Sequence, residues 1–353
     1  MLSRNGRPDA WHFAAAAVVT PDGRVVARLG DPEVAAHPRS GVKPFQAMPL
    51  VIGGGCDRFS LAPDDLALIC GSHGGTAEHV ERTVSLLERG GFEVDDLGCA
   101  PHAPFDKTAA AGLRQRGEES TRLHNNCSGK HAGMLLACRL LNLPAAGYLE
   151  PDHPLQMMVL DELREFARLD GQPIEIAIDG CGAPTPRLPL AAAARGYAAL
   201  ADPTAAGLDD GRCKATGRVV EAMTVAPRMV AGAGRFTTRL MEVTGGRVLA
   251  KEGADGFYAA AVRGPVALGL ALKIADGSEA CRDGVVLEVL RQLGSLSKEE
   301  LGELDDFYHR PIRNWNGDQV GELAPDLELQ ESAASPGTYG TSTRRSVRRS
   351  DSA

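Results

Sequence analysis

The chain has 353 residues, of which 43% are apolar and 24% charged, values close to the averages of soluble globular proteins. Its 41 glycines and 22 prolines stay below the share typical of collagen or of disordered chains, so a fibrous or wholly unfolded protein is excluded. The formal net charge of −8 argues against a broad nucleic-acid-binding surface.

The first apolar stretch predicts a β-hairpin rather than a membrane anchor. Residues 14–20 and 24–27 flank Pro21-Asp22-Gly23, a turn triplet between two short apolar runs. The run from Phe13 to Val19 is far shorter than the ~20 residues that a bilayer-spanning helix needs. No basic leader precedes it, so we expect neither a signal peptide nor a membrane partner.

Helices and strands alternate irregularly along the rest of the chain, without an internal repeat. Apolar spacing and glycine stops predict helices over residues 44–52, 64–70, 78–89 and 154–170. Alternating or apolar runs predict strands over residues 174–178, 247–251 and 257–262. This pattern indicates an α+β protein, which we expect to form a single domain over residues 1–330.

The composition changes sharply near the C-terminus. From Ser332 onward the sequence is rich in small polar residues and ends with two arginine pairs, without apolar periodicity. Such a segment buries too little apolar surface to offset its ordering entropy. We therefore expect a disordered tail over residues 331–353.

Eight cysteines are spread along the chain without a close pair, at positions 56, 70, 99, 127, 138, 181, 213 and 281. In a chain of this size the pattern indicates reduced thiols in a cytoplasmic enzyme, of which a subset could bind a metal ion.

Two short serine motifs are candidates for nucleophilic chemistry. In Ser40-x-x-Lys43 the two side chains lie one helical turn apart, so a neutral lysine could accept the hydroxyl proton. Taken alone, this tetrapeptide is better explained as an N-capping serine beside a solvated lysine. Ser72-His73 stands among glycines, which let the backbone approach a ligand, although an ordinary turn explains it equally simply.

Two further motifs indicate a binding site. Residues 124–134 place many polar side chains at the start of an apolar helix, where the helix dipole favours anionic ligands. Asp179 and Cys181 end a predicted strand and could converge on one point. Cys127 and Cys181 together would suit a soft cation such as zinc, but two inert buried thiols explain the spacing equally well.

Together these motifs resemble the Rhizobium-type (class 3) L-asparaginase family over roughly Trp11 to Leu329. The matching stretches are Arg39–Gln46, Cys70–Gly74, His124–Met134, Asp179–Pro184, Val230–Phe236, Lys251–Gly256, Leu272–Gly277 and Asn314–Gly317. The order of Ser-x-x-Lys followed by Lys-x-Gly is also similar to that of serine β-lactamases.

The resemblance implies a homodimeric enzyme that hydrolyses L-asparagine to L-aspartate and ammonia. It implies an α-β sandwich similar to serine β-lactamases and glutaminases, with a mixed sheet flanked by helices. Thr237 stands where the family pattern has aspartate. The residues carried over are Ser40 and Ser72 as hydroxyl candidates, Lys43 and Lys251 as their amines, Cys127, Lys130 and Cys181 as zinc ligands, and Arg39, His73, Asp179 and Gly253 for substrate binding.

Amide hydrolysis needs a nucleophile, donors for the oxyanion and a proton for ammonia. The two serine–lysine sets could supply the first and the third, and backbone N–H groups near Ser72 and Gly253 the second. We expect the serines to cooperate, Ser72 borrowing its amine from Lys251. Two alternatives stay open: another serine amidase, acting on glutamine or a small peptide amide, and a zinc-stabilised binding protein without turnover.

Overall fold

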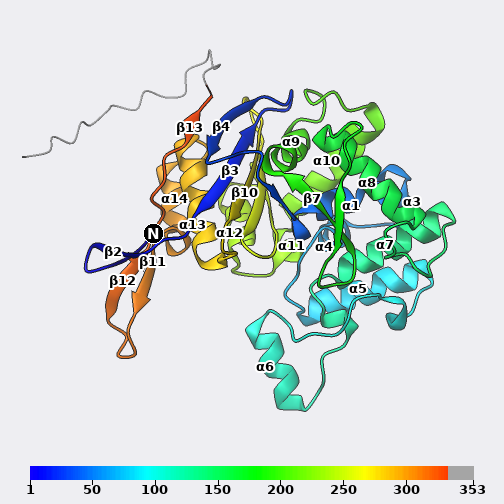
Figure 1. Ribbon diagram of the computed structural model, residues 1–353. Helices are drawn as coiled ribbons and strands as arrows, with labels where there is room; N and C mark the ends of the chain where they lie inside the picture. The colour runs from blue at the N-terminus through cyan, green and yellow to red at the C-terminus, as the bar shows by residue number, and fades with distance from the viewer. Residues whose placement is uncertain (333–353) are drawn as a thin grey trace, which may run out of the picture.

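The computed structural model describes residues 1–332. A six-stranded sheet in the order β13-β4-β3-β10-β9-β8 forms its centre (Figure 1). Its strands are β3 (Ala14–Val19), β4 (Val25–Leu29), β8 (Val248–Glu252), β9 (Phe257–Val262), β10 (Leu268–Ile274) and β13 (Gln330–Glu331). Both β8 and β9 are buried at every position, so this part of the sheet is covered on both faces.

Helices cover the two faces of the central sheet. On one side α9 (Leu190–Ala201) packs on β3, β9 and β10, and on the other α13 (Glu279–Gln292) packs on β9 and β10 (Figure 1). Gly269 permits the close approach of α9, because a Cβ at this position would lie 1.9 Å from the carbonyl oxygen of Ala194. The glycine at the second position of β10 is therefore a packing requirement.

A cluster of helices lies beside the sheet and contains several of the motifs singled out in the sequence, among them those at residues 39–46, 70–74 and 124–134. Within it α2, α4, α7 and α10 pack on one another, and α5 packs on α7. The helices of this part are α1 (Lys43–Gln46), α2 (Met48–Ile52), α3 (Gly55–Arg58), α4 (Pro63–Ile69), α5 (Ala77–Gly90), α6 (Lys107–Arg116), α7 (Ser128–Leu141), α8 (Pro154–Ala167), α10 (Asp210–Val225), α11 (Pro227–Ala231) and α12 (Phe236–Val243). Two small helices, α14 (Lys298–Glu303) and α15 (Asp305–Tyr308), follow α13.

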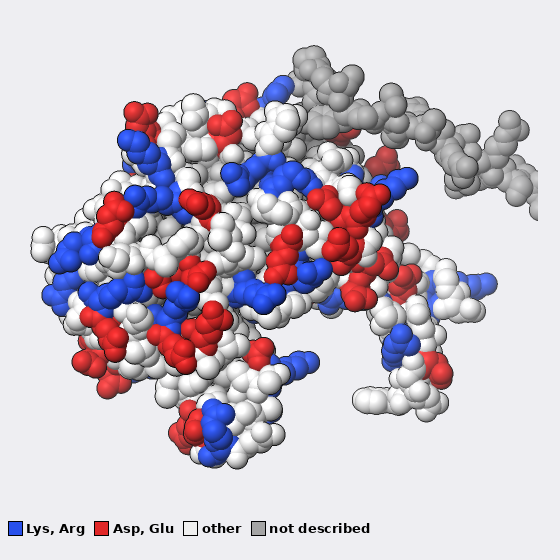
Figure 2. Space-filling model, turned by 180° about the vertical axis from the view of Figure 1, so that it is seen from behind, with Lys and Arg blue, Asp and Glu red and all other residues white. Residues whose placement is uncertain are grey.

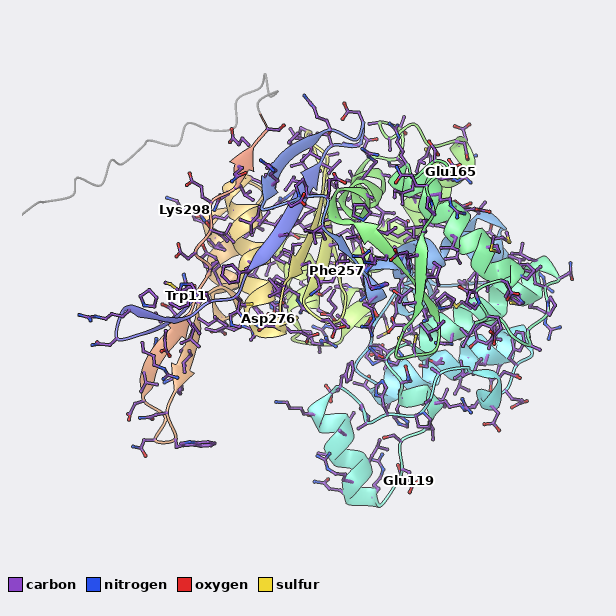
Figure 3. The ribbon with its side chains drawn as sticks, viewed as in Figure 1. Trp11, Glu119, Glu165, Phe257, Asp276 and Lys298 are labelled. Carbon is purple, nitrogen blue, oxygen red and sulfur yellow. The ribbon has the colours of Figure 1, made fainter. Side chains whose placement is uncertain are left out.

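Two smaller sheets complete the fold. β5 (Ala35–Ala36), β7 (Pro184–Pro189) and β6 (Glu175–Ile178) form a three-stranded sheet. A projecting arm in the order β11-β12-β1-β2 consists of Arg310–Arg313, Gln319–Leu323, Leu2–Arg4 and Arg7–Ala10 (Figure 1). Trp11 and Asp276 lie where the arm meets the body, and His12 Nδ1 is 2.6 Å from Asp276 Oδ2 there (Figure 3).

The elements predicted from sequence are found in the structure. The hairpin is β3 and β4, with Gly23 in the turn at a φ of 95°. The four predicted helices correspond to α1 with α2, α4, α5 and α8, and the three predicted strands to β6, β8 and β9. Gly91 ends α5 in the left-handed conformation that glycine favours. The α+β class is thereby confirmed.

Two expectations about the architecture need correction. A mixed sheet is wrong, because every strand pair within residues 1–332 is antiparallel. Short turns join β3 to β4 and β8 to β9 to β10, whereas parallel neighbours need a long crossover. The tail also begins later than residue 331, because β13 pairs with β4 and the Ser332 N–H donates to the Val26 carbonyl. The remaining tail residues, 333–353, lie outside the described part.

The surface carries charges of both signs. Lysine and arginine side chains alternate with aspartate and glutamate over the face shown in Figure 2. Within residues 1–332, none of the helices combines the length and the apolar character needed to cross a membrane. All eight cysteines are free thiols.

Candidate active site

Ser72 lies just after α4, at the meeting point of segments from three parts of the chain. Its N–H donates to the Val230 carbonyl at 2.6 Å, which fixes the backbone beside the loop that follows α11. The side chain is buried, and its Oγ accepts hydrogen bonds from two amines, Lys43 Nζ at 3.0 Å and Lys251 Nζ at 2.9 Å. The fold therefore assembles a serine with two lysines around one oxygen.

Lys43 serves Ser72, which differs from the pairing with Ser40 expected from the sequence. Its Nζ donates to the Gly71 carbonyl at 2.5 Å and to Ser72 Oγ. The reason is local backbone geometry. Residues 39–42 form a 3₁₀ helix that begins with Arg39 at a φ of 52°, and the α-helix starts only at Lys43. Ser40 and Lys43 consequently do not share a regular α-helical face.

Lys251 contacts Ser72 as the sequence analysis expected, from strand β8. Burial and the positive charges of Lys43 and Arg235 lower the pKa of Lys251 to about 7. Its Nζ also donates to the Glu252 carbonyl at 2.9 Å, which holds the amine in place. A lysine with this pKa is largely neutral slightly above pH 7, so it can accept the Ser72 proton.

A pocket of about 450 Å³ opens over Ser72 and also contains Ser40. Its lining residues are Ser40, Ser72, Phe105, Asn126, Arg235, Glu252, Gly253, Ala254 and Glu279. Of these, Asn126 and Arg235 belong to motifs quoted above, but sequence reasoning gave them no role. Phe105 and Glu279 lie outside those motifs, and only the fold shows that they are at the site.

Two of the backbone N–H groups in the loops expected to bind the oxyanion, those of Ser72 and Gly253, are already used. The Ser72 amide donates to Val230, and the Gly253 amide donates to the Phe257 carbonyl at 3.0 Å. That part of the expectation is therefore wrong for these two amides. Gly253 is required for packing instead, since a Cβ there would lie 2.3 Å from the Pro38 carbonyl oxygen. The side-chain amide of Asn126 is the neutral donor that lines the pocket.

Cys127, Lys130 and Cys181 converge in a buried cluster next to the serine site. Lys130 Nζ donates to Cys181 Sγ at 2.9 Å, and the Cys127 and Cys181 thiols influence each other's pKa. Interaction with the Cys181 thiol lowers the pKa of Cys127 well below the usual thiol value, with help from Lys43. Burial opposes the charged form of Lys130, but the two sulfurs outweigh it and raise its pKa.

This cluster has the donor chemistry of a zinc site with three ligands. Two sulfurs and one amine are soft or borderline donors of the kind that zinc prefers. No group of three or more histidine, cysteine, aspartate or glutamate side chains within residues 1–332 is placed to hold a metal, so the set depends on Lys130. That lysine would have to lose its proton to coordinate.

Arg39, Asp179 and His73 lie near the site but do not line the pocket over Ser72. Arg39 donates to Asp179 Oδ1 at 3.0 and 2.7 Å and to Asp255 at 2.5 Å, and so ties together two loops. His73 is fully buried, and burial lowers its pKa well below the usual value. Its Nδ1 accepts from the Gly75 N–H, so the proton lies on Nε2, which donates to Ser128 Oγ at 2.9 Å.

The contact between Thr237 and Glu252 accounts for the threonine at a position where the family pattern has aspartate. Its Oγ1 donates to Glu252 Oε2 at 3.1 Å and lies 3.1 Å from the Tyr258 hydroxyl. An aspartate here would place a second carboxylate against Glu252, whereas threonine supplies a donor. The substitution therefore accommodates the buried Glu252 carboxylate.

Comparison with known proteins identifies the family of this chain from its sequence. Solved structures of Mglu, in its native form and in its tris and glutamate form, are similar at a TM-score of 0.36 with 17% and 16% sequence identity. They align with 82% and 79% of this chain, which in turn spans 66% and 59% of theirs. No curated protein gives a match. The sequence model described as L-asparaginase II matches residues 1–325, so the chain belongs to the L-asparaginase II family.

Proposed function

We propose that this protein is an L-asparaginase that hydrolyses L-asparagine to L-aspartate and ammonia with Ser72 as the nucleophile. The observation that carries the proposal is the convergence of Lys43 and Lys251 on Ser72 Oγ at the base of the pocket. The family supports an amidohydrolase activity. A fold similar to that of serine β-lactamases would suit this arrangement of a serine and two lysines.

The acylation half of the reaction follows from the contacts of Ser72. Neutral Lys251 takes the hydroxyl proton while Oγ attacks the amide carbon, giving a tetrahedral oxyanion. Lys43 contributes positive charge beside the attacking Ser72 Oγ, and Asn126 offers an amide donor from the pocket wall. When the C–N bond breaks, the proton on Lys251 moves to the leaving nitrogen, and ammonia departs from a Ser72 ester.

Deacylation uses the same groups in the same order. Lys251 is neutral again after ammonia leaves, so it can take a proton from a water molecule that attacks the ester. The bond between Ser72 Oγ and the acyl carbon then breaks, and Oγ recovers its proton from Lys251. Ser40 lines the same pocket and supplies a second hydroxyl for this proton traffic.

The proposal includes one zinc ion held by Cys127, Lys130 and Cys181. Zinc would supply a fixed positive charge that either braces the site or binds the amino acid end of the substrate. Lys43 links this cluster to the serine site, because its positive charge helps to lower the pKa of Cys127 and its Nζ donates to Ser72 Oγ.

Release of ammonia from purified protein tests the proposal directly. We expect steady turnover of L-asparagine and slower turnover of L-glutamine. Preference for glutamine or a peptide amide would make the protein a different serine amidase. Tight amide binding without ammonia release would favour a zinc-stabilised binding protein, which leaves the two lysines on Ser72 without a purpose.

Two further properties belong to the proposal. The family resemblance implies a homodimer, and sedimentation analysis would give its mass. Localisation in the cytoplasm would agree with the eight free thiols, because disulfides form chiefly in oxidising compartments.

A further inference from the structure

Two buried polar atoms in the wall of the Ser72 pocket lack hydrogen-bond partners. They are Arg235 Nη1 and Glu252 Oε1. The two residues form an ion pair, with Arg235 Nη2 2.6 Å from Glu252 Oε1, but this contact lacks the geometry of a hydrogen bond. Buried polar atoms in native proteins are almost always hydrogen-bonded, so a neighbouring pair of orphans calls for an explanation.

The surroundings hold both side chains in position without satisfying these atoms. Glu252 is anchored through its other oxygen, Oε2, which accepts from Thr237 Oγ1 at 3.1 Å. The Arg235 guanidinium lies over the Phe105 ring, 5.8 Å from its centroid, and the side chain is one-third exposed. Arg235 is therefore reachable from solvent, whereas Glu252 is almost completely buried.

The charges of the pair match those of an amino acid headgroup. A guanidinium N–H donates to a carboxylate, and a carboxylate oxygen accepts from an ammonium group. Both headgroup charges sit on one α-carbon. The two orphan atoms are correspondingly close, since Nη1 shares its guanidinium carbon with the Nη2 that lies 2.6 Å from Oε1. One zwitterion could therefore satisfy both.

The position relative to the nucleophile suits a short amide. Arg235, Glu252 and Ser72 all line the same pocket. A headgroup at the Arg235–Glu252 pair thus leaves its side-chain amide within this small space near Ser72.

We propose that Arg235 and Glu252 form the headgroup subsite of this enzyme, Arg235 Nη1 binding the α-carboxylate and Glu252 Oε1 binding the α-ammonium group of a free amino acid amide. The inference rests on the proposed function and deepens it, because it restricts the substrates to free α-amino acids with a short side-chain amide. An asparagine residue within a peptide lacks a free α-ammonium group, a free α-carboxylate or both. The subsite therefore excludes it as a substrate.

The test compares three amides that differ only in the headgroup. L-asparagine has both charges, succinamic acid lacks the amino group, and 3-aminopropanamide lacks the carboxylate. Arg235→Met should lower kcat/KM by about 10- to 100-fold on the first two, the range of a lost hydrogen bond to a charged group. The rate on 3-aminopropanamide should change less than about threefold. Arg235→Lys, which keeps the charge, should recover part of the loss.

Glu252→Gln should lower the rate on the two amides that carry an amino group and not on the one that lacks it. Its kcat/KM falls on L-asparagine and 3-aminopropanamide, and changes little on succinamic acid. Because the Glu252 charge also raises the pKa of Lys251, rates are compared on the pH plateau of each variant. Arg239→Met is the matched control, since Arg239 lies in helix α12, which Arg235 directly precedes, but pairs with Glu242 at the surface.

Equal losses on all three amides for Arg235→Met would overturn the inference, because the arginine would then act by positioning other groups. Absence of turnover by the wild-type protein would instead contradict the proposed function. In that case calorimetric titration of Ser72→Ala with L-aspartate still tests the subsite. Adding Arg235→Met should weaken the Kd at least about tenfold, and an unchanged Kd would overturn the inference.

Discussion

Ser72 Oγ accepts hydrogen bonds from both lysines. We therefore expect the removal of this one oxygen to cause a large loss of activity. Ser72→Ala removes the proposed nucleophile, so we expect kcat to fall more than about 10³-fold while the protein stays folded. Circular dichroism checks the fold, and mass spectrometry after a rapid acid quench should find the acyl group on Ser72 in the wild-type protein.

Ser40 tests whether the two hydroxyls act as a unit. Residues that act together lose function non-additively, so Ser40→Ala and the double variant should fall to a residual rate similar to that of Ser72→Ala. The two serines line one pocket, but Ser40 lacks a side-chain hydrogen bond among those found within residues 1–332. Should Ser40→Ala keep more than about a tenth of wild-type turnover, the pair hypothesis is wrong and Ser72 acts alone.

Lys251 predicts the acidic limb of the pH profile. Burial, together with Lys43 and Arg235, lowers the pKa of Lys251 to about 7, and only the neutral amine accepts the Ser72 proton. Activity should therefore fall as the pH drops below about 7 and level off above it. Lys251→Met should abolish this limb together with most of the activity, whereas the exposed Lys298→Met should retain both (Figure 3). An unchanged limb in Lys251→Met would show that another group is the base.

At the level of elements, two glycines set how closely the hairpin of β8 and β9 approaches the segment that carries Ser40. A Cβ at Gly41 would lie 2.6 Å from the ring of Phe257, which stands near the centre of the molecule (Figure 3). A Cβ at Gly253 would meet the Pro38 carbonyl and the same ring. This packing holds the hairpin that carries Lys251 beside the segment that carries Ser40, although the two are far apart in sequence.

Gly253→Ala should consequently disturb both stability and activity. Overpacking against backbone costs about 1–3 kcal/mol, which corresponds to a fall in Tm of at least ~2 °C. The matched control is Gly217→Ala in helix α10, where nothing lies within 4 Å of the added Cβ. Because alanine is the better helix former, this control should keep or raise the Tm. Equal effects of the two variants would contradict the packing argument.

The thiol–amine cluster joins the first turn of α7 to the loop between β6 and β7. We expect about one zinc per chain by elemental analysis, lost in the double variant Cys127→Ser with Cys181→Ser. Cys138→Ser, a buried thiol later in α7, is the control that should keep its zinc. Zinc content should also fall at low pH, because Lys130 binds metal only without its proton. Protein that carries no zinc without prior chelation would contradict this prediction.

Across the whole molecule, the sequence predicted which motifs belong to the site more reliably than it predicted which of their side chains contact one another. The strand of Lys251 and the loop of Ser72 were predictable from local pattern, and their contact was expected. The contact of Lys43 with Ser72 instead of Ser40 was not predictable, because it depends on the positive φ of Arg39. Local spacing assumes a regular helix, and this segment breaks that assumption.

Long-range packing accounts for what the sequence left out. Phe105, Arg235 and Glu279 reach the pocket from a loop before α6, from the start of α12 and from α13. Their places depend on how helices pack around the sheet, which periodicity does not specify. The antiparallel sheet order was missed for the same reason, since β3 pairs with β10 across most of the chain.

The last segment of the described chain connects the arm to the central sheet, and two truncations test its role. Leu327 and Leu329 pack against the core, the Leu329 N–H donates to Gln292, and β13 covers the edge of β4. Removing residues 333–353 keeps all these contacts, so Tm and activity should stay nearly unchanged. Removing residues 327–353 deletes both leucines, uncovers the core surface against which they pack and exposes the edge of β4. The burial of a whole leucine side chain is worth about 1.5–3 kcal/mol. These leucines are only partly buried, so we expect the Tm to fall by at least ~2 °C in the second truncation alone. Differential scanning calorimetry of both truncated proteins would measure this, and an equal Tm would mean that the segment adds no stability to the fold.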